Sequence, residues 1–157
     1  MKNRELSRQH DQLKRLFSRT KEFEDNNISI EVISHWAKYL CVLCAGFLEN
    51  SLAEVYSEYS SRTANDKVAN FSKVSLEHIN NPKTEKFVEI TGSFDKEWRK
   101  KLEDFVDENG RKQAIDSIMS HRHRIAHGKD SDITMHRLSD YYKKSIEVVT
   151  YIEHLCE

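Results

Sequence analysis

Apolar residues recur along this chain at the spacing of helices, and the strict alternation that marks strands is missing. From residue 2 to residue 24, leucine and phenylalanine recur at helical spacing on an otherwise charged segment. The segment from 30 to 59 holds the densest apolar content and predicts a long helix at the centre of the core. Because one proline and four glycines are all that interrupt 157 residues, we predict an all-α fold.

Shorter helices are expected between residues 60 and 107. The apolar residues that define them fall into two sets, one of Val68, Phe71, Val74 and Leu76 and one of Phe94, Trp98, Leu102 and Phe105. Between these two sets, a further helix should begin with Pro82 in its first turn, where proline is favoured.

Two helices are predicted in the last third of the chain. The first carries Ile115, Ile118 and Ile125 and should end at Gly128, since glycine readily adopts the left-handed conformation of a helix cap. The second should run from Thr134, as its N-cap, to the C-terminus. The whole pattern predicts an up-down bundle of about five to seven helices, with residues 1–157 forming a single domain.

Charge and cysteine content limit the classes of function. The formal net charge is -1, so any site for a polyanion must be local. The N-terminal segment is charged, and no run reaches the roughly 20 apolar residues of a membrane span. Three cysteines, an odd number, fit a reducing compartment, and Cys41 and Cys44 lie within an apolar helix where small core residues are expected. We expect a cytoplasmic protein with no membrane partner.

An arginine interrupts the apolar stripe of the helix that precedes Gly128. Steps of three and four residues lead from Ile115 and Ile118 to Arg122 and then to Ile125. Arginine keeps its charge and presents five donors, so it is seldom buried without a partner. Glu49, in the central apolar helix, is the predicted partner; the alternatives are that Arg122 closes an internal salt bridge with no further role or reaches the surface.

Positive charge gathers around this arginine. Between residues 111 and 129 the chain has five cations against the single acid Asp116; the cations are Arg111, Lys112, Arg122, Arg124 and Lys129. This local excess predicts an anion-binding surface, although a charge run is more often a solvated helix face.

His127 follows Arg122 by five residues, so on an unbroken helix the two side chains diverge by about 140°. The end of the helix at Gly128 should free His127 from strict helical geometry, and a second copy of the chain across a dimer interface should bring two such pairs around one cleft. A lone histidine at a helix C-terminus more often compensates the helix dipole.

The segment from Arg122 to Gly128, Arg-His-Arg-Ile-Ala-His-Gly, resembles the motif of the HEPN superfamily, an arginine followed by a polar residue and, after a gap, a histidine. The resemblance extends over most of the chain, including Gly46-Phe47-Leu48-Glu49 in the long helix and an amphipathic last helix. This order of elements looks like the RiboL-PSP-type branch of bacterial HEPN nucleases. His123 occupies the polar position, where Asn is commoner.

The resemblance implies a homodimeric helical bundle that cleaves RNA without a metal or any other cofactor, often in toxin–antitoxin or antiphage systems. Arg122 and His127 would be the catalytic pair, with His123 and Glu49 in supporting roles. The neighbouring cations Arg124, Lys129, Arg111 and Lys112 would bind the RNA, and a cognate antitoxin would be a further protein partner.

Two other interpretations compete with a nuclease. His123 and His127 are four residues apart and, with His121 or His136, could hold a metal ion, but Arg124 stands where zincin-type helices have a glutamate. The stronger alternative is a non-catalytic HEPN module that dimerises or binds a nucleotide or protein. The presence of both Arg122 and His127 favours the nuclease.

Overall fold

A computed structural model describes the backbone of residues 1–157 and all side chains except those of Lys21 and Glu24. The described chain contains no strand, which confirms the all-α class. Its helices, at the upper end of the predicted number, are α1 Arg4–Asp25, α2 Ile30–Thr63, α3 Asp66–Leu76, α4 Thr84–Phe94, α5 Lys96–Asp107, α6 Arg111–Ala126 and α7 Met135–Leu155.

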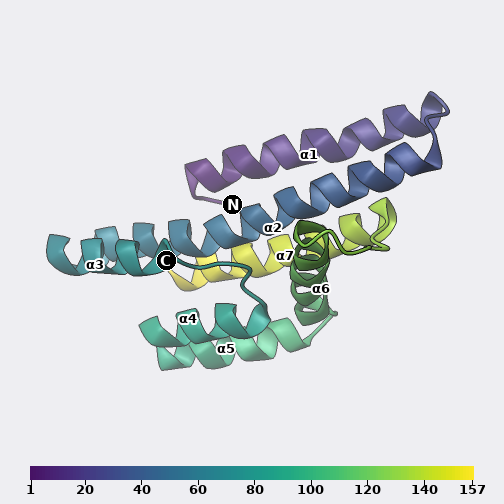
Figure 1. The fold of residues 1–157 in the computed structure, drawn as a ribbon. Helices are drawn as coiled ribbons and strands as arrows, with labels where there is room; N and C mark the ends of the chain where they lie inside the picture. The colour runs from purple at the N-terminus through teal and green to yellow at the C-terminus, as the bar shows by residue number, and fades with distance from the viewer.

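The two long N-terminal helices form an antiparallel hairpin, and α7 runs alongside α2 (Figure 1). Helix α3 folds back along the C-terminal part of α2, while α4 and α5 form a second, shorter hairpin. Helix α6 crosses the others steeply and packs against both α2 and α7. Residues 121–126, at its C-terminal end, are half-buried or exposed.

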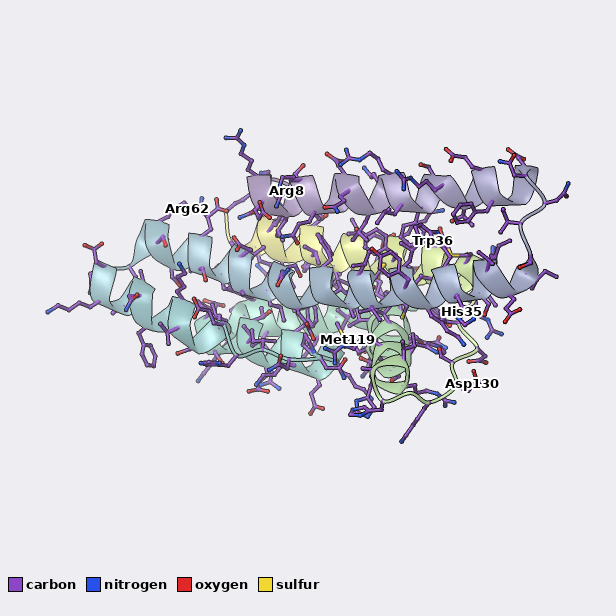
Figure 2. All side chains as sticks on the ribbon, turned by 45° about the horizontal axis from the view of Figure 1, so that its top comes forward. Arg8, His35, Trp36, Arg62, Met119 and Asp130 are labelled. Atoms are coloured by element: carbon purple, nitrogen blue, oxygen red, sulfur yellow. The ribbon has the colours of Figure 1, made fainter. Side chains whose placement is uncertain are left out.

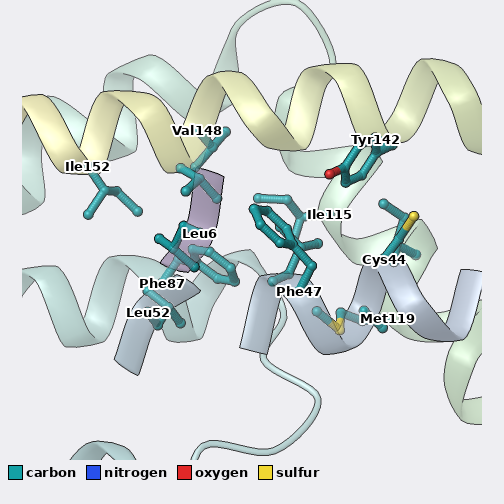
Figure 3. Packing of buried hydrophobic residues seen from close by; sticks show 14 of the residues in the cluster. Leu6, Cys44, Phe47, Leu52, Phe87, Ile115, Met119, Tyr142, Val148 and Ile152 are labelled. Carbon is teal, nitrogen blue, oxygen red and sulfur yellow. The ribbon is translucent and has the colours of Figure 1, made fainter. Parts of the chain in front are cut away.

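The core lies where α2 meets α1, α6 and α7 (Figure 3). Leu6 from α1, Leu52 from α2, Ile115 from α6 and Val148 from α7 are fully buried in one cluster. Burial of such a side chain contributes about 1.5–3 kcal/mol to the free energy of unfolding. The apolar face of α6 is therefore fixed against α2 and α7, which determines where its polar end points.

The helix ends flanking the motif follow the predicted caps. Gly128 has a φ of +64°, the left-handed conformation expected after the end of α6. The Thr134 hydroxyl accepts a hydrogen bond from the Arg137 backbone N–H at 3.3 Å, which makes Thr134 the N-cap of α7.

Two predictions about the middle of the chain were wrong. Pro82 precedes the first turn of its helix, because α4 begins at Thr84 with Lys83 as its N-cap. Phe94 ends α4 and is separated from Trp98 by Asp95, whose carboxylate accepts hydrogen bonds from the first turn of α5. This N-cap breaks the apolar run into two helices.

The apolar residues of α3 are mostly outside the core. Leu76 is buried, but Val68, Val74 and above all Phe71, which is 72% exposed, face solvent. Helix α3 packs chiefly on α2 through its other side.

Helix α2 has the length and composition of a membrane span, with a mean hydropathy of 1.2 over its most apolar window. It packs against α1, α3, α6 and α7, and about a dozen of its residues are buried in the core. Helix α2 is therefore a core helix of the bundle.

Candidate functional site at the end of α6

The C-terminal end of α6 is closed by a pair of backbone hydrogen bonds. The Lys129 N–H donates to the Arg124 carbonyl at 2.9 Å, and the Gly128 N–H donates to the Ile125 carbonyl at 3.1 Å. This is the Schellman pattern, which depends on the left-handed Gly128. The cap fixes where His127 leaves the helix.

Arg122 lies where the apolar stripe of α6 emerges from the core. Ile115 and Ile118 are fully buried, whereas the Arg122 side chain is 32% exposed. Arg122 Nη2 lies 3.9 Å from Glu49 Oε1 on α2. The structure thus pairs the two residues that the sequence analysis paired. Because this distance exceeds that of a hydrogen bond, the pair leaves the donors of the guanidinium free for another anion.

Glu49 has a second partner that the sequence analysis missed. The Asn81 backbone N–H, in the connection between α3 and α4, donates to Glu49 Oε1 at 2.5 Å. Asn81 has a φ of +48°, a conformation in which asparagine is over-represented. The Asn80-Asn81-Pro82 sequence was a turn signal, but no local pattern indicated a contact with a residue 32 positions away.

The two histidines of the motif lie beside each other on the surface. Their ring centroids are 4.4 Å apart at an interplanar angle of 60°, and both residues are exposed. The His127 N–H still donates to the His123 carbonyl, but its ψ of 17° lies outside the helical range, so His127 departs from regular helical geometry as expected. His127 is the C-cap, and its ring packs against His123, one position beyond Arg122 on the helix.

The basic residues of α6 do not form one surface. Arg111 and Lys112 lie in the first turn, about 24 Å along the helix from His127 at 1.5 Å per residue. Arg111 is 11% exposed and donates to Glu147 and to the Phe105 carbonyl, while Lys112 lies near Asp107. Arg111 and Lys112 therefore do not form one cluster with the motif, and their binding of RNA stays a prediction.

Arg124 and Lys129 remain near the motif. Arg124 Nε donates to the Asp130 carbonyl at 2.7 Å, so this arginine partly serves to hold the connection between α6 and α7. Lys38 on α2 lies 3.5 Å from the Asp130 carboxylate. Figure 2 shows Asp130 on the same side of the molecule as His35 of α2. Lys129 is exposed.

His121 supports the same connection from inside. Its Nδ1 lies 2.9 Å from the hydroxyl of the buried Ser131, and Asp132 is 4.0 Å away. Burial lowers the pKa of His121, because the charged imidazolium is poorly solvated there, although Asp132 opposes the shift. His121 is thus a structural residue behind the motif.

The described part of the structure offers little for metal or thiol chemistry at this site. Among the described side chains, no group of three or more metal-ligating residues comes together. Cys41 and Cys44 are buried free thiols, and burial raises the pKa of Cys41 to about 12 and that of Cys44 well above its usual value. A protonated thiol is a poor nucleophile and metal ligand, which is consistent with their prediction as core residues.

The fold and the site define an all-helical protein with an Arg-x4-His motif at the end of its sixth helix. The family model described as RiboL-PSP-HEPN matches residues 5–157, nearly the whole chain. The protein belongs to this family, and HEPN domains are generally associated with ribonucleases. No curated protein and no solved structure matches the chain.

Proposed function

We propose that this protein is a metal-independent endoribonuclease. The RNA 2′-oxygen attacks the adjacent phosphorus while its proton passes to the neutral imidazole of His127. The bond from phosphorus to the 5′-oxygen then breaks, that oxygen takes a proton from solvent water, and protonated His127 returns its proton to solvent. The products are a 2′,3′-cyclic phosphate and a 5′-hydroxyl.

The observation that carries this proposal is the state of Arg122. Its guanidinium is partly exposed and, among the described side chains, is restrained by one long ion pair with Glu49. A planar fork with free donors suits the phosphoryl oxygens, on which negative charge accumulates as the 2′-oxygen attacks. One such donor is worth roughly 3 kcal/mol to the transition state.

His127 needs a partner to act beside an arginine. In one chain it packs on His123, which we propose as its supporting residue, and at about 100° per residue its position is turned by about 140° from that of Arg122. A homodimer would let His127 of each copy complete the site of the other, as the resemblance to HEPN nucleases implies. We therefore propose that the active enzyme is a dimer.

The surface for the second copy lies on α2, next to Glu49. Val42 and Gly46 precede Glu49 by seven and three residues and share its helix face. Val42 is 38% exposed, and a Cβ built on Gly46 would meet no atom within 4 Å. With Leu16 they line a hollow of about 230 Å³ between α1 and α2. Since this apolar surface borders the incomplete site, we propose that a second copy covers it.

A matched pair of substitutions tests this surface. Val42→Arg should convert a dimer of 18.5 kDa chains into monomers and abolish cleavage, while leaving the helical content unchanged. Val68→Arg places the same charge on an equally open part of α3 and should leave both mass and cleavage unaltered. Light scattering after gel filtration gives the mass. A Val42→Arg protein that is still dimeric and active would place the interface elsewhere.

The biological setting follows from the resemblance alone. We propose a toxin or antiphage effector restrained by a cognate antitoxin, with RNA as substrate and Arg124 and Lys129 as its remaining basic contacts. The alternative is a non-catalytic HEPN module that dimerises or binds a nucleotide or protein.

The deciding experiment is cleavage of a labelled RNA by the purified protein in EDTA. We expect the wild type to cut, and His127→Ala or a 2′-deoxy residue at the cut site to abolish cutting. A folded dimer that cuts none of several structured and unstructured RNAs would favour the binding module.

A further inference from the structure

The connection between α3 and α4 touches the site through a single backbone group. The Asn81 N–H donates to Glu49 Oε1, the same oxygen that lies 3.9 Å from Arg122 Nη2. Hydrogen bonds from a backbone N–H to a carboxylate are among the stronger ones in proteins. The amide therefore fixes the position of the oxygen that faces the guanidinium.

The connection is itself anchored to the helix that carries Arg122. The Thr84 N–H and hydroxyl both donate to Asp116 Oδ1, at 2.8 and 2.9 Å, and Asp116 lies on α6. Pro82, between these contacts and Asn81, is buried. Helices α2 and α6 are thus linked through residues 81–84 as well as through the Arg122–Glu49 pair.

The amide has a specific consequence for Arg122. A carboxylate free to move would approach the guanidinium and form a closer, two-bond pair, which would occupy the donors that a phosphate needs. Held by Asn81, Glu49 stays at the longer distance: it orients Arg122 but does not saturate it.

We infer that Asn81 is a positioning residue for Arg122, acting through its backbone amide and Glu49; its effect on cleavage rests on the ribonuclease activity proposed above. The side chain is not the acting part, because its Oδ1 is buried without a hydrogen-bond partner among the described residues. What asparagine supplies is tolerance of the left-handed backbone at φ +48°.

Two substitutions separate the role of the Asn81 backbone amide from that of its side chain. Asn81→Gly keeps the N–H and the left-handed conformation and should keep kcat within about twofold. Asn81→Val strains that conformation and should lower kcat about tenfold by withdrawing the amide, with little change in KM. Asn27→Val is the control, because Asn27 has a φ of +54° in the turn before α2, remote from Glu49.

A double-mutant cycle excludes a merely structural effect. In a Glu49→Ala background, Asn81→Val should have no further effect on kcat, since the carboxylate through which it acts is gone. An equal loss in both backgrounds, or an equal loss from Asn27→Val, would overturn the inference.

A readout independent of catalysis keeps the two proposals apart. The NMR signal of Arg122 Nε–H should move in Asn81→Val, stay in Asn81→Gly, and be insensitive to Asn81→Val once Glu49 is alanine. If the wild type cuts no RNA, the proposed function fails while this signal still decides whether Asn81 positions Arg122. An Arg122 signal unmoved by Asn81→Val would overturn the inference.

Discussion

The two ends of α6 each carry an arginine, and the two arginines have opposite surroundings. Arg111 is 11% exposed, donates to Glu147 at 2.8 Å and to the Phe105 carbonyl at 2.9 Å, and has its guanidinium 3.8 Å from the centre of the Phe105 ring. Arg122 is 32% exposed, and its one ion-pair partner among the described side chains is Glu49, at 3.9 Å. The same side chain on the same helix is hydrogen-bonded at one end and available at the other.

This difference separates a stabilising arginine from a functional one. An arginine whose donors and ring face are occupied contributes to the free energy of unfolding, and a phosphate would have to displace those contacts. An arginine with one long ion pair contributes less to stability and keeps donors free. Exposure and partner distance, rather than charge alone, identify the site.

The largest expected effect is loss of cleavage at the available end. Arg122→Ala should lower kcat at least about hundredfold, because the phosphoryl charge loses its donor. Arg122→Lys should be nearly as damaging, since lysine keeps the charge but loses the planar fork. Cleavage rates on one labelled RNA measure both.

Arg137→Ala is the control for this comparison. Arg137 is an exposed arginine on α7 near the same connection, where it lies 3.9 Å from Asp132. Its loss should leave cleavage close to wild type. Substantial activity in Arg122→Lys would contradict the role of the fork.

The next effect in size is on stability, at the end of α6 that carries Arg111. Arg111→Ala should lower the free energy of unfolding by about 2 kcal/mol, since it removes charge-assisted hydrogen bonds and a cation–π contact. Urea unfolding followed by circular dichroism measures it. Arg122→Lys, which keeps a cation beside Glu49, should be clearly more stable than Arg111→Ala. The reverse order would contradict the comparison.

Much of the fold could be predicted from the sequence, because helix periodicity and caps are local signals. The central helix, the left-handed Gly128 and the Thr134 cap are set by residues within one turn of each other. Phe94 was assigned to the wrong helix because its apolar spacing continues across Asp95, and only the cap geometry shows the break.

The site was predicted less completely, because its contacts join distant parts of the chain. Arg122 stood out as a charge on an apolar stripe, and Glu49 as an acid within the core helix. The Asn81 amide was missed because it is a backbone group without a side-chain signature. Arg111 was grouped with the motif because proximity in sequence along a helix was taken for proximity in space.

The smallest expected effect concerns the pH dependence of stability behind the motif. Burial lowers the pKa of His121, so as pH falls through its ordinary value near 6.5 the unfolded chain takes up the proton first. The free energy of unfolding should therefore decrease from pH 7.5 to pH 5. His121→Asn, which does not titrate and retains a polar group for Ser131, should reduce this decrease.

His10, whose pKa burial also lowers, should account for a further share of the decrease, measured in His10→Asn. Urea unfolding at both pH values measures the decrease in the free energy of unfolding. An unchanged decrease in His121→Asn would mean that folding does not lower the pKa of His121, and would contradict its buried position behind the connection between α6 and α7.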